Sequence, residues 1–118
     1  MYRLSLIIGE IYNKYLPLAE KKGISLSLDY PDTTGSIANP EEIKADLEKH
    51  LDSALSRSKN SNITIAARRD CIVISDSGTT LSKPVCKLLS NSRVEVKSRV
   101  GFGTTVKINL KSNEKSEN

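Results

Sequence analysis

Five segments of this chain alternate between apolar and polar residues, and this alternation is the strongest constraint on its fold. The segments are residues 24–30, 62–68, 71–76, 92–98 and 104–110. Successive side chains of a β-strand point to opposite faces of a sheet, so alternation makes one face apolar and leaves the other polar. The pattern predicts a single sheet that needs cover on one face, with residues 92–110 forming a β-hairpin.

Two longer segments have the helical period that such a cover requires. Apolar residues recur at intervals of three and four over residues 3–22 and again over residues 40–59. Residues 39–42 read Asn-Pro-Glu-Glu, which is typical of a helix start because a capping Asn precedes a Pro and two acids. Pro17 is expected to kink or divide the first helix. Residues 81–91 are expected to form a short helix or an irregular connector.

These elements predict an α/β (α+β) two-layer sandwich. Its sheet is expected to be mixed, mostly antiparallel and of about five strands, with the helices on one face. We expect one domain over residues 1–110, because a chain of 118 residues can bury a single core. Residues 111–118 are polar and without aliphatic side chains, which favours a disordered tail.

The composition and charge of the chain favour some cellular locations and some kinds of partner over others. The sequence has no run of eighteen apolar residues and no signal-peptide pattern at its start, so we expect a cytoplasmic location and no membrane partner. The net charge of +4 is compatible with an acidic partner but does not require one. Nucleic acid is not expected as the partner, because the basic residues lack interleaved aromatic residues.

Metal binding is not expected from the cysteine and histidine residues. Cys71 and Cys86 lack metal-ligand spacing, and His50 is the only histidine. His50 falls on the apolar stripe of the second predicted helix, so a packed position in the core is the expected role.

Four short stretches occur in an order that matches a known family. They are the segment 15–31, the helical stretch HLDSALSRS at residues 50–58, the strand end ISDSGTT at residues 74–80, and the hairpin 92–110 with its Gly-Thr-Thr step. In this order they resemble the ATP-binding domain of sensor histidine kinases, within the histidine kinase-like ATPase family (GHKL, or Bergerat fold). The resemblance spans roughly residues 4–110.

The resemblance implies a nucleotide site at the end of the strand 71–76. Asp76 matches the carboxylate that accepts a hydrogen bond from the adenine amino group, Gly78 matches the glycine box, and a Thr near Thr105 supports the carboxylate through water. Ser53 stands where the family has the Asn that holds magnesium. Lys49 lies one helical turn earlier. A shift of one residue in the alignment offers Asp52 as the magnesium ligand instead.

The chain departs from the family where the triphosphate would bind. A Ser hydroxyl is a weaker magnesium ligand than an Asn carbonyl, and the charge of Lys49 would repel magnesium, although it could attract a bare phosphate. Residues 79–92 contain no glycine and take the place of the family's mobile lid and second glycine-rich loop. On this interpretation Asp76 is vestigial and faces a shallow, open groove. Alternatively, Asp76 ends its strand and caps the helix expected within residues 81–91.

These departures favour a degenerate histidine kinase-like ATPase domain. It would act as a non-catalytic signalling or protein-binding module, with no catalytic residue, no required cofactor, and weak or no ATP binding. Its partner would be a protein, such as a response regulator or a kinase component. Two alternatives stay open: a reduced but functional ATP- or ADP-binding domain of a two-component sensor kinase, which would hold ATP and Mg²⁺ at the residues named above, and a basic nucleic-acid-associated protein.

Overall fold

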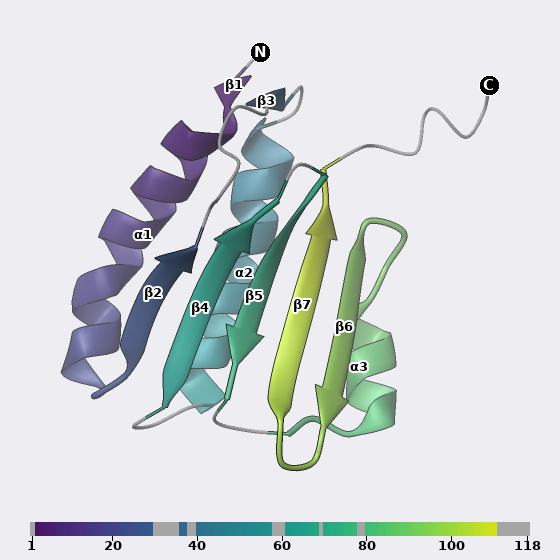
Figure 1. Ribbon diagram of the computed structural model, residues 1–118. Coiled ribbons are helices and arrows are strands. Elements are labelled where there is room, and N and C mark those ends of the chain that lie inside the picture. The colour runs from purple at the N-terminus through teal and green to yellow at the C-terminus, as the bar shows by residue number, and fades with distance from the viewer. Residues whose placement is uncertain are drawn as a thin grey trace.

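The computed structural model describes residues 2–29, 36–37, 40–57, 61–68, 70–77 and 80–110. The elements in chain order are β1 (Tyr2–Arg3), α1 (Leu4–Lys21), β2 (Ser25–Asp29), β3 (Ser36–Ile37), α2 (Pro40–Arg57), β4 (Asn62–Ala67), β5 (Cys71–Asp76), α3 (Lys83–Leu89), β6 (Val94–Arg99) and β7 (Gly103–Asn109). Figure 1 shows their arrangement. The predicted tail, residues 111–118, and the predicted helix cap Asn39 lie outside the described residues.

The main sheet confirms the predicted architecture. Among the described residues it has five strands in the order β2-β4-β5-β7-β6. β2 runs parallel to β4, and the other neighbours are antiparallel, so the sheet is mixed and mostly antiparallel. The pair β1–β3 forms a separate two-stranded sheet, which the sequence pattern did not predict.

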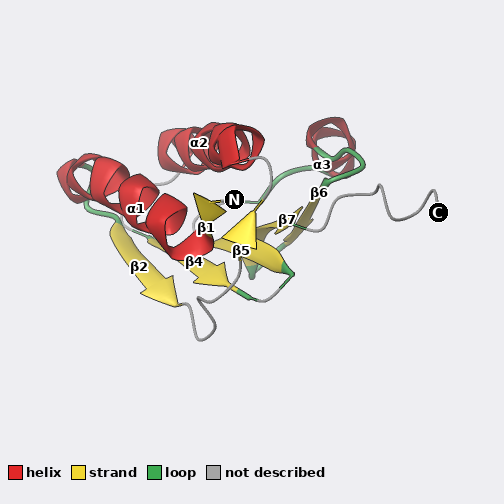
Figure 2. Ribbon diagram, turned by 90° about the horizontal axis from the view of Figure 1, so that it is seen from above, coloured by secondary structure: helices red, strands yellow, loops and turns green. Residues whose placement is uncertain are grey.

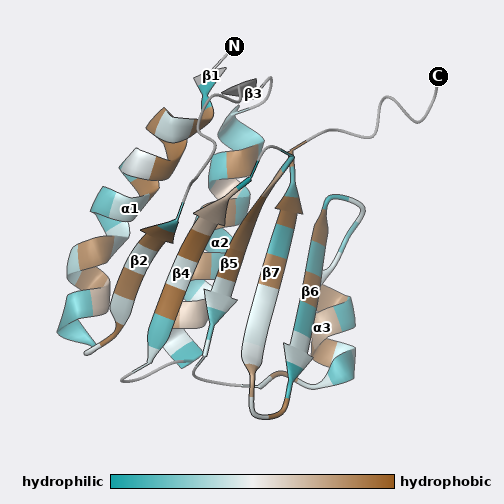
Figure 3. Ribbon diagram, in the orientation of Figure 1, coloured by the Kyte–Doolittle hydropathy of each residue, from teal (hydrophilic) through white to brown (hydrophobic). Residues whose placement is uncertain are grey.

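The three helices that the structure describes lie on one face of the sheet, as Figure 2 shows in the view along it. The apolar residues of each strand point toward them, and Figure 3 shows the resulting alternation along β4 and β7. Ile63, Ile65, Ile72 and Ile108 have no exposed surface. The buried hydrophobic residues of the described part of the chain are aliphatic apart from Tyr15, and the buried polar residues there are His50, Asp76 and Thr104. The prediction of one covered face is therefore confirmed.

Pro17 does not divide the first helix, because α1 continues from Leu4 to Lys21. Its ring lies on the exposed side, while Tyr15 and Ala19 on either side of it are buried. Packing of the apolar face thus holds the helix together across the lost backbone donor. The helix ends before Gly23, whose φ of 72° allows the reversal, and Ile24 N–H donates to Ala19 O at 2.9 Å.

The segment expected to be a short helix or a connector contains α3, which packs against β6. Ser82 caps α3, since its Oγ accepts a hydrogen bond from Val85 N–H at 3.4 Å. Asp76 therefore does not cap this helix, contrary to one of the two interpretations of that residue. After α3, Ser90 Oγ accepts from Val96 N–H at 3.0 Å and Asn91 Oδ1 accepts from Val94 N–H at 2.8 Å.

None of the helices that the structure describes is long and apolar enough to cross a lipid bilayer.

Candidate functional site

Asp76 is the last residue of β5, and its side chain lies on the face that the helices cover. It continues the row of Ile72 and Ile74, and it is 3% exposed. The expected open groove is thus not what this carboxylate meets. A buried carboxylate is costly unless it is paired with a cation or hydrogen-bonded, so its partners define the chemistry of this corner.

Arg57, at the C-terminal end of α2, is a charged partner of Asp76. Its Nη2 lies 3.4 Å from Asp76 Oδ2, and its Nη1 donates a hydrogen bond to Ser53 Oγ. Ser53 is one helical turn before Arg57, so both side chains lie on the same side of α2. One guanidinium therefore contacts both the residue matched to adenine recognition and the residue matched to magnesium binding.

Sequence reasoning missed Arg57 as part of this corner. The spacing of four residues between Ser53 and Arg57 was visible, but the contact with Asp76 joins residues from two elements that only the fold brings together. The one available signal was the need of a buried acid for a cation.

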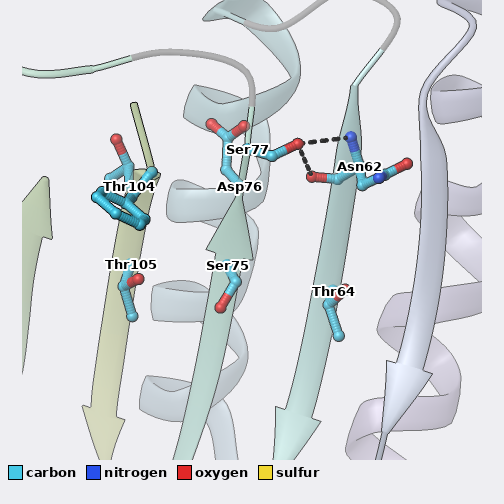
Figure 4. Close-up of a pocket in the computed structure, with 8 residues that line it drawn as sticks. Asn62, Thr64, Ser75, Asp76, Ser77, Thr104 and Thr105 are labelled. Atoms are coloured by element: carbon cyan, nitrogen blue, oxygen red, sulfur yellow. Dashed lines mark hydrogen bonds between the residues drawn. The ribbon is translucent and has the colours of Figure 1, made fainter. Parts of the chain in front are cut away.

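Thr104, and not Thr105, shares the covered face with Asp76. The two residues are direct partners across β5 and β7, and Thr104 is 2% exposed. Its Oγ1 lies 3.0 Å from Ser98 Oγ, which also accepts a hydrogen bond from Leu81 N–H at 2.8 Å. Thr105 is exposed on the opposite face, where Figure 4 shows it beside Ser75. A shift of one residue along a strand reverses the face, and the sequence alone does not fix that choice.

The other residues that the resemblance selected lie in different surroundings. Lys49 is exposed on α2, at the helical spacing that places it on the side of Ser53 and Arg57. Asp52 is directed toward α1, where its Oδ1 accepts a hydrogen bond from Tyr15 Oη at 2.9 Å. Gly78 lies outside the described residues. The structure thus joins Ser53 to Asp76 through Arg57 and separates Asp52 and Thr105 from them.

Gly103 fixes the approach of β7 to the end of β5. Its φ is 94°, and a Cβ at this position would lie 2.0 Å from the carbonyl oxygen of Asp76. Any side chain would push the two strands apart beside Asp76. The requirement for glycine here therefore comes from close backbone packing.

His50 is buried on α2, as predicted, at 4% exposure. Burial lowers the pKa of His50 below its ordinary value, and the nearby charges of Lys49 and Arg57 lower it further, while Asp46 opposes them. Within the described part of the chain, no three His, Cys, Asp or Glu residues gather in a group that could hold a metal ion.

Comparison with known proteins gives a result only at the level of structure. No family model matches the sequence, and no curated protein matches it. The nucleotide-free catalytic domain of histidine kinase ThkA is similar, with a TM-score of 0.75 and 16% identity over 92% of this chain and 95% of that one. This chain has the fold of a histidine kinase catalytic domain. The resemblance seen in the sequence is confirmed at that level.

Two further structures place the histidine kinase-like fold in larger proteins. The cytoplasmic segment of histidine kinase QseC is similar with a TM-score of 0.71 and 18% identity, over 93% of this chain and 72% of that one. Histidine kinase ThkA in complex with the response regulator TrrA is similar with a TM-score of 0.71 and 14% identity, over 93% of this chain and 41% of that one. This chain therefore spans less than half of the longer ThkA chain.

Proposed function

We propose that this histidine kinase-like domain is a non-catalytic signalling module, which binds a protein partner and binds Mg-ATP weakly or not at all. The observation that carries the proposal is the guanidinium of Arg57, which contacts Asp76 and Ser53 at once. Adenine would need the carboxylate of Asp76 as an acceptor, and magnesium would need the hydroxyl of Ser53. A nucleotide would have to compete with an internal cation for both groups.

The energies involved support weak binding. A hydrogen bond from adenine to Asp76 would contribute a net stabilisation of about 1 kcal/mol, or somewhat more because the acceptor is charged. The lost translational and rotational freedom of a bound molecule costs several times that amount, at least about 4 kcal/mol. Tight nucleotide binding therefore also needs contacts with the triphosphate, usually from magnesium and backbone N–H groups. Residues 77–82, which connect β5 to α3, offer one glycine, Gly78, for such contacts.

The proposed partner class is a protein of two-component signalling. Histidine kinase ThkA, whose domain has this fold, has been solved in complex with the response regulator TrrA. The net charge of +4 suits an acidic surface. A response regulator or a kinase component is accordingly the partner that we propose for this chain.

Isothermal calorimetry with Mg-ATP and Mg-ADP tests the nucleotide part of the proposal. We expect no saturable heat from the wild type, and no thermal stabilisation by either nucleotide. Asp76→Asn should change neither result. Thr105→Val is the matched control, because Thr105 lies on the opposite face of the same pair of strands. Micromolar binding that Asp76→Asn abolishes and Thr105→Val preserves would establish the reduced ATP-binding domain instead.

Titration of the labelled domain with purified receiver domains from the same genome tests the partner. We expect saturable binding to one or a few of them that does not require nucleotide. If none of them binds, the two-component partner is wrong, whatever the calorimetry shows.

A further inference from the structure

The face of the sheet opposite the described helices has a row of hydroxyl groups across three strands. Thr64 of β4 is paired with Ser75 of β5, and Ser75 with Thr105 of β7. Lys97 of β6 is paired with Thr105 and extends the row to the edge of the sheet. Figure 4 shows Thr64, Ser75 and Thr105 side by side on neighbouring strands. Such cross-strand neighbours have Cβ atoms about 5 Å apart, so one ligand can reach several of them.

Two adjoining hollows lie along this row, with Phe102 lining both. The first has a volume of about 220 Å³ and is lined mainly by residues with hydroxyl and amide groups, including Asn62, Ser75 and Thr105, and its lining also includes Asp76. The second has a volume of about 240 Å³ and includes Lys97 and Arg99. Sites for drug-sized ligands usually measure about 300–1,000 Å³. Each hollow therefore fits a unit as small as one base or one phosphate group.

The ring of Phe102 is held out toward solvent by the turn between β6 and β7. It is 75% exposed, although it is the only Phe of the sequence. Its N–H donates to Arg99 O at 3.0 Å, and Gly101, with a φ of 87°, provides the left-handed residue of the turn. The guanidinium of Arg99 lies over the ring, 5.3 Å from its centre. An aromatic ring and a cation are thus presented together beside the hydroxyl row.

We propose that this surface, defined by Thr64, Ser75, Thr105, Lys97, Arg99 and Phe102 and named the Phe102 face, binds single-stranded nucleic acid. One base occupies the hydroxyl-lined hollow and stacks on Phe102. Hydroxyl and amide groups donate and accept hydrogen bonds, as the edges of bases do. The adjoining phosphate lies beside Arg99 and Lys97, which is the combination of cation and aromatic ring that single strands require.

The charges of this face are available to a polyanion. Lys97 pairs with Glu95 at 3.3 Å, but both side chains are at least half exposed, and such surface pairs contribute little. The sequence did not favour nucleic acid as the partner, because the basic residues lack interleaved aromatic residues, although a nucleic-acid-associated protein stayed open as an alternative. The fold places the single Phe between the basic residues of β6 and the hydroxyl groups of three strands. Asp76 and Thr104 also line the first hollow, but the Ser75 and Thr105 side chains lie on the opposite face of their strands from the buried Asp76 carboxylate. This proposal therefore does not depend on the proposed function.

Fluorescence anisotropy of the full chain with labelled oligonucleotides of about twelve nucleotides, at about 50 mM salt, tests the proposal. We expect Phe102→Ala to weaken binding of a single strand roughly 5- to 150-fold, and Phe102→Trp to preserve it. Val100→Ala is the matched control, since Val100 is 85% exposed in the same turn and has no ring. Because these residues are exposed, the variants should melt as the wild type does.

The salt dependence of oligonucleotide binding and competition by other polyanions separate single-strand recognition from general attraction of a basic surface to negative charge. Arg99→Gln should lower the slope of log K against log salt by about one, as the loss of one phosphate contact does. Three results would overturn the proposal: no binding at low salt, equal binding by Phe102→Ala and the wild type, or equal competition by duplex DNA or heparin. The last result would assign the surface to any polyanion, including an acidic polysaccharide.

Discussion

Arg57 and Asp76 determine much of each other's chemistry, because both side chains are largely shielded from water. Their exposed fractions are 19% and 2%. The attraction between opposite charges is stronger in such surroundings than at the surface, and so is the cost of leaving one of them unpaired. The pair also joins the end of α2 to the end of β5. Its contribution should therefore be visible in stability as well as in ligand binding.

A double-mutant cycle measures this contribution. Arg57→Gln alone removes the positive charge beside the buried carboxylate of Asp76, and we expect a loss of about 3 kcal/mol in the free energy of unfolding. Adding Asp76→Asn removes the uncompensated charge, so the double variant should be more stable than the sum of the two single losses indicates. Urea unfolding of the four proteins gives the coupling energy. Strictly additive losses would mean that the two side chains do not interact in solution.

At the scale of elements, Gly101 and Gly103 allow the chain to turn in the β6–β7 hairpin, and they differ in how closely other atoms approach them. Both have positive φ, 87° at Gly101 and 94° at Gly103. A Cβ at Gly101 would meet nothing within 4 Å, whereas at Gly103 it would meet the backbone of Asp76. Conformational strain acts at both positions, and steric exclusion acts at Gly103 alone.

This difference predicts unequal effects of the same substitution. Gly101→Ala should cost about 1 kcal/mol, which is the penalty of a left-handed backbone for a residue with a Cβ. Gly103→Ala should cost clearly more, because the β5 backbone must also move. Thermal or urea unfolding of the two variants provides the comparison. Equal losses would show that β7 approaches β5 less closely than the structure indicates.

At the scale of the whole molecule, global stability should depend on pH through His50. The unfolded chain takes up a proton near the ordinary pKa of 6.5, while burial and nearby cations lower the pKa in the folded protein. Below that pH the unfolded state binds more protons, so the free energy of unfolding should fall as the pH falls. We expect His50→Gln to be less stable at neutral pH but to lose this part of the slope as the pH falls below the ordinary pKa of 6.5. An unchanged slope would assign the effect to the carboxylates.

The sequence predicted the features that have a period and missed those that depend on distant residues. Alternation in β4, β5 and β7 predicted the sheet, and helical spacing predicted α1 and α2. The β1–β3 pair has two residues in each strand, too few to show a period. Pro17 was expected to kink or divide the first helix, and α1 is not divided there, because local propensity does not include the packing on either side of it.

In the candidate site, too, the sequence predicted what is local and missed what depends on distant residues. Asp76 was found because it ends an apolar strand in a recognisable stretch. The contact with Arg57 depends on how α2 lies over β5, and the choice between Thr104 and Thr105 depends on strand register, which a shift of one residue reverses. Neither the contact with Arg57 nor the register of β7 can be recognised from the residues next to it in the sequence. The Phe102 face was missed for a related reason, since its hydroxyl groups come from three strands.

The oxygens of Ser90 and Asn91 have an effect that extends beyond a single molecule. They accept hydrogen bonds from Val96 and Val94, so two backbone donors of β6 are already occupied. A strand at the margin of a sheet otherwise offers its backbone to any extended segment that meets it, which is how ordered aggregates grow. The two polar residues after α3 therefore leave fewer backbone donors of β6 for an added strand, and we expect ordered aggregation to be slower than for an unprotected edge.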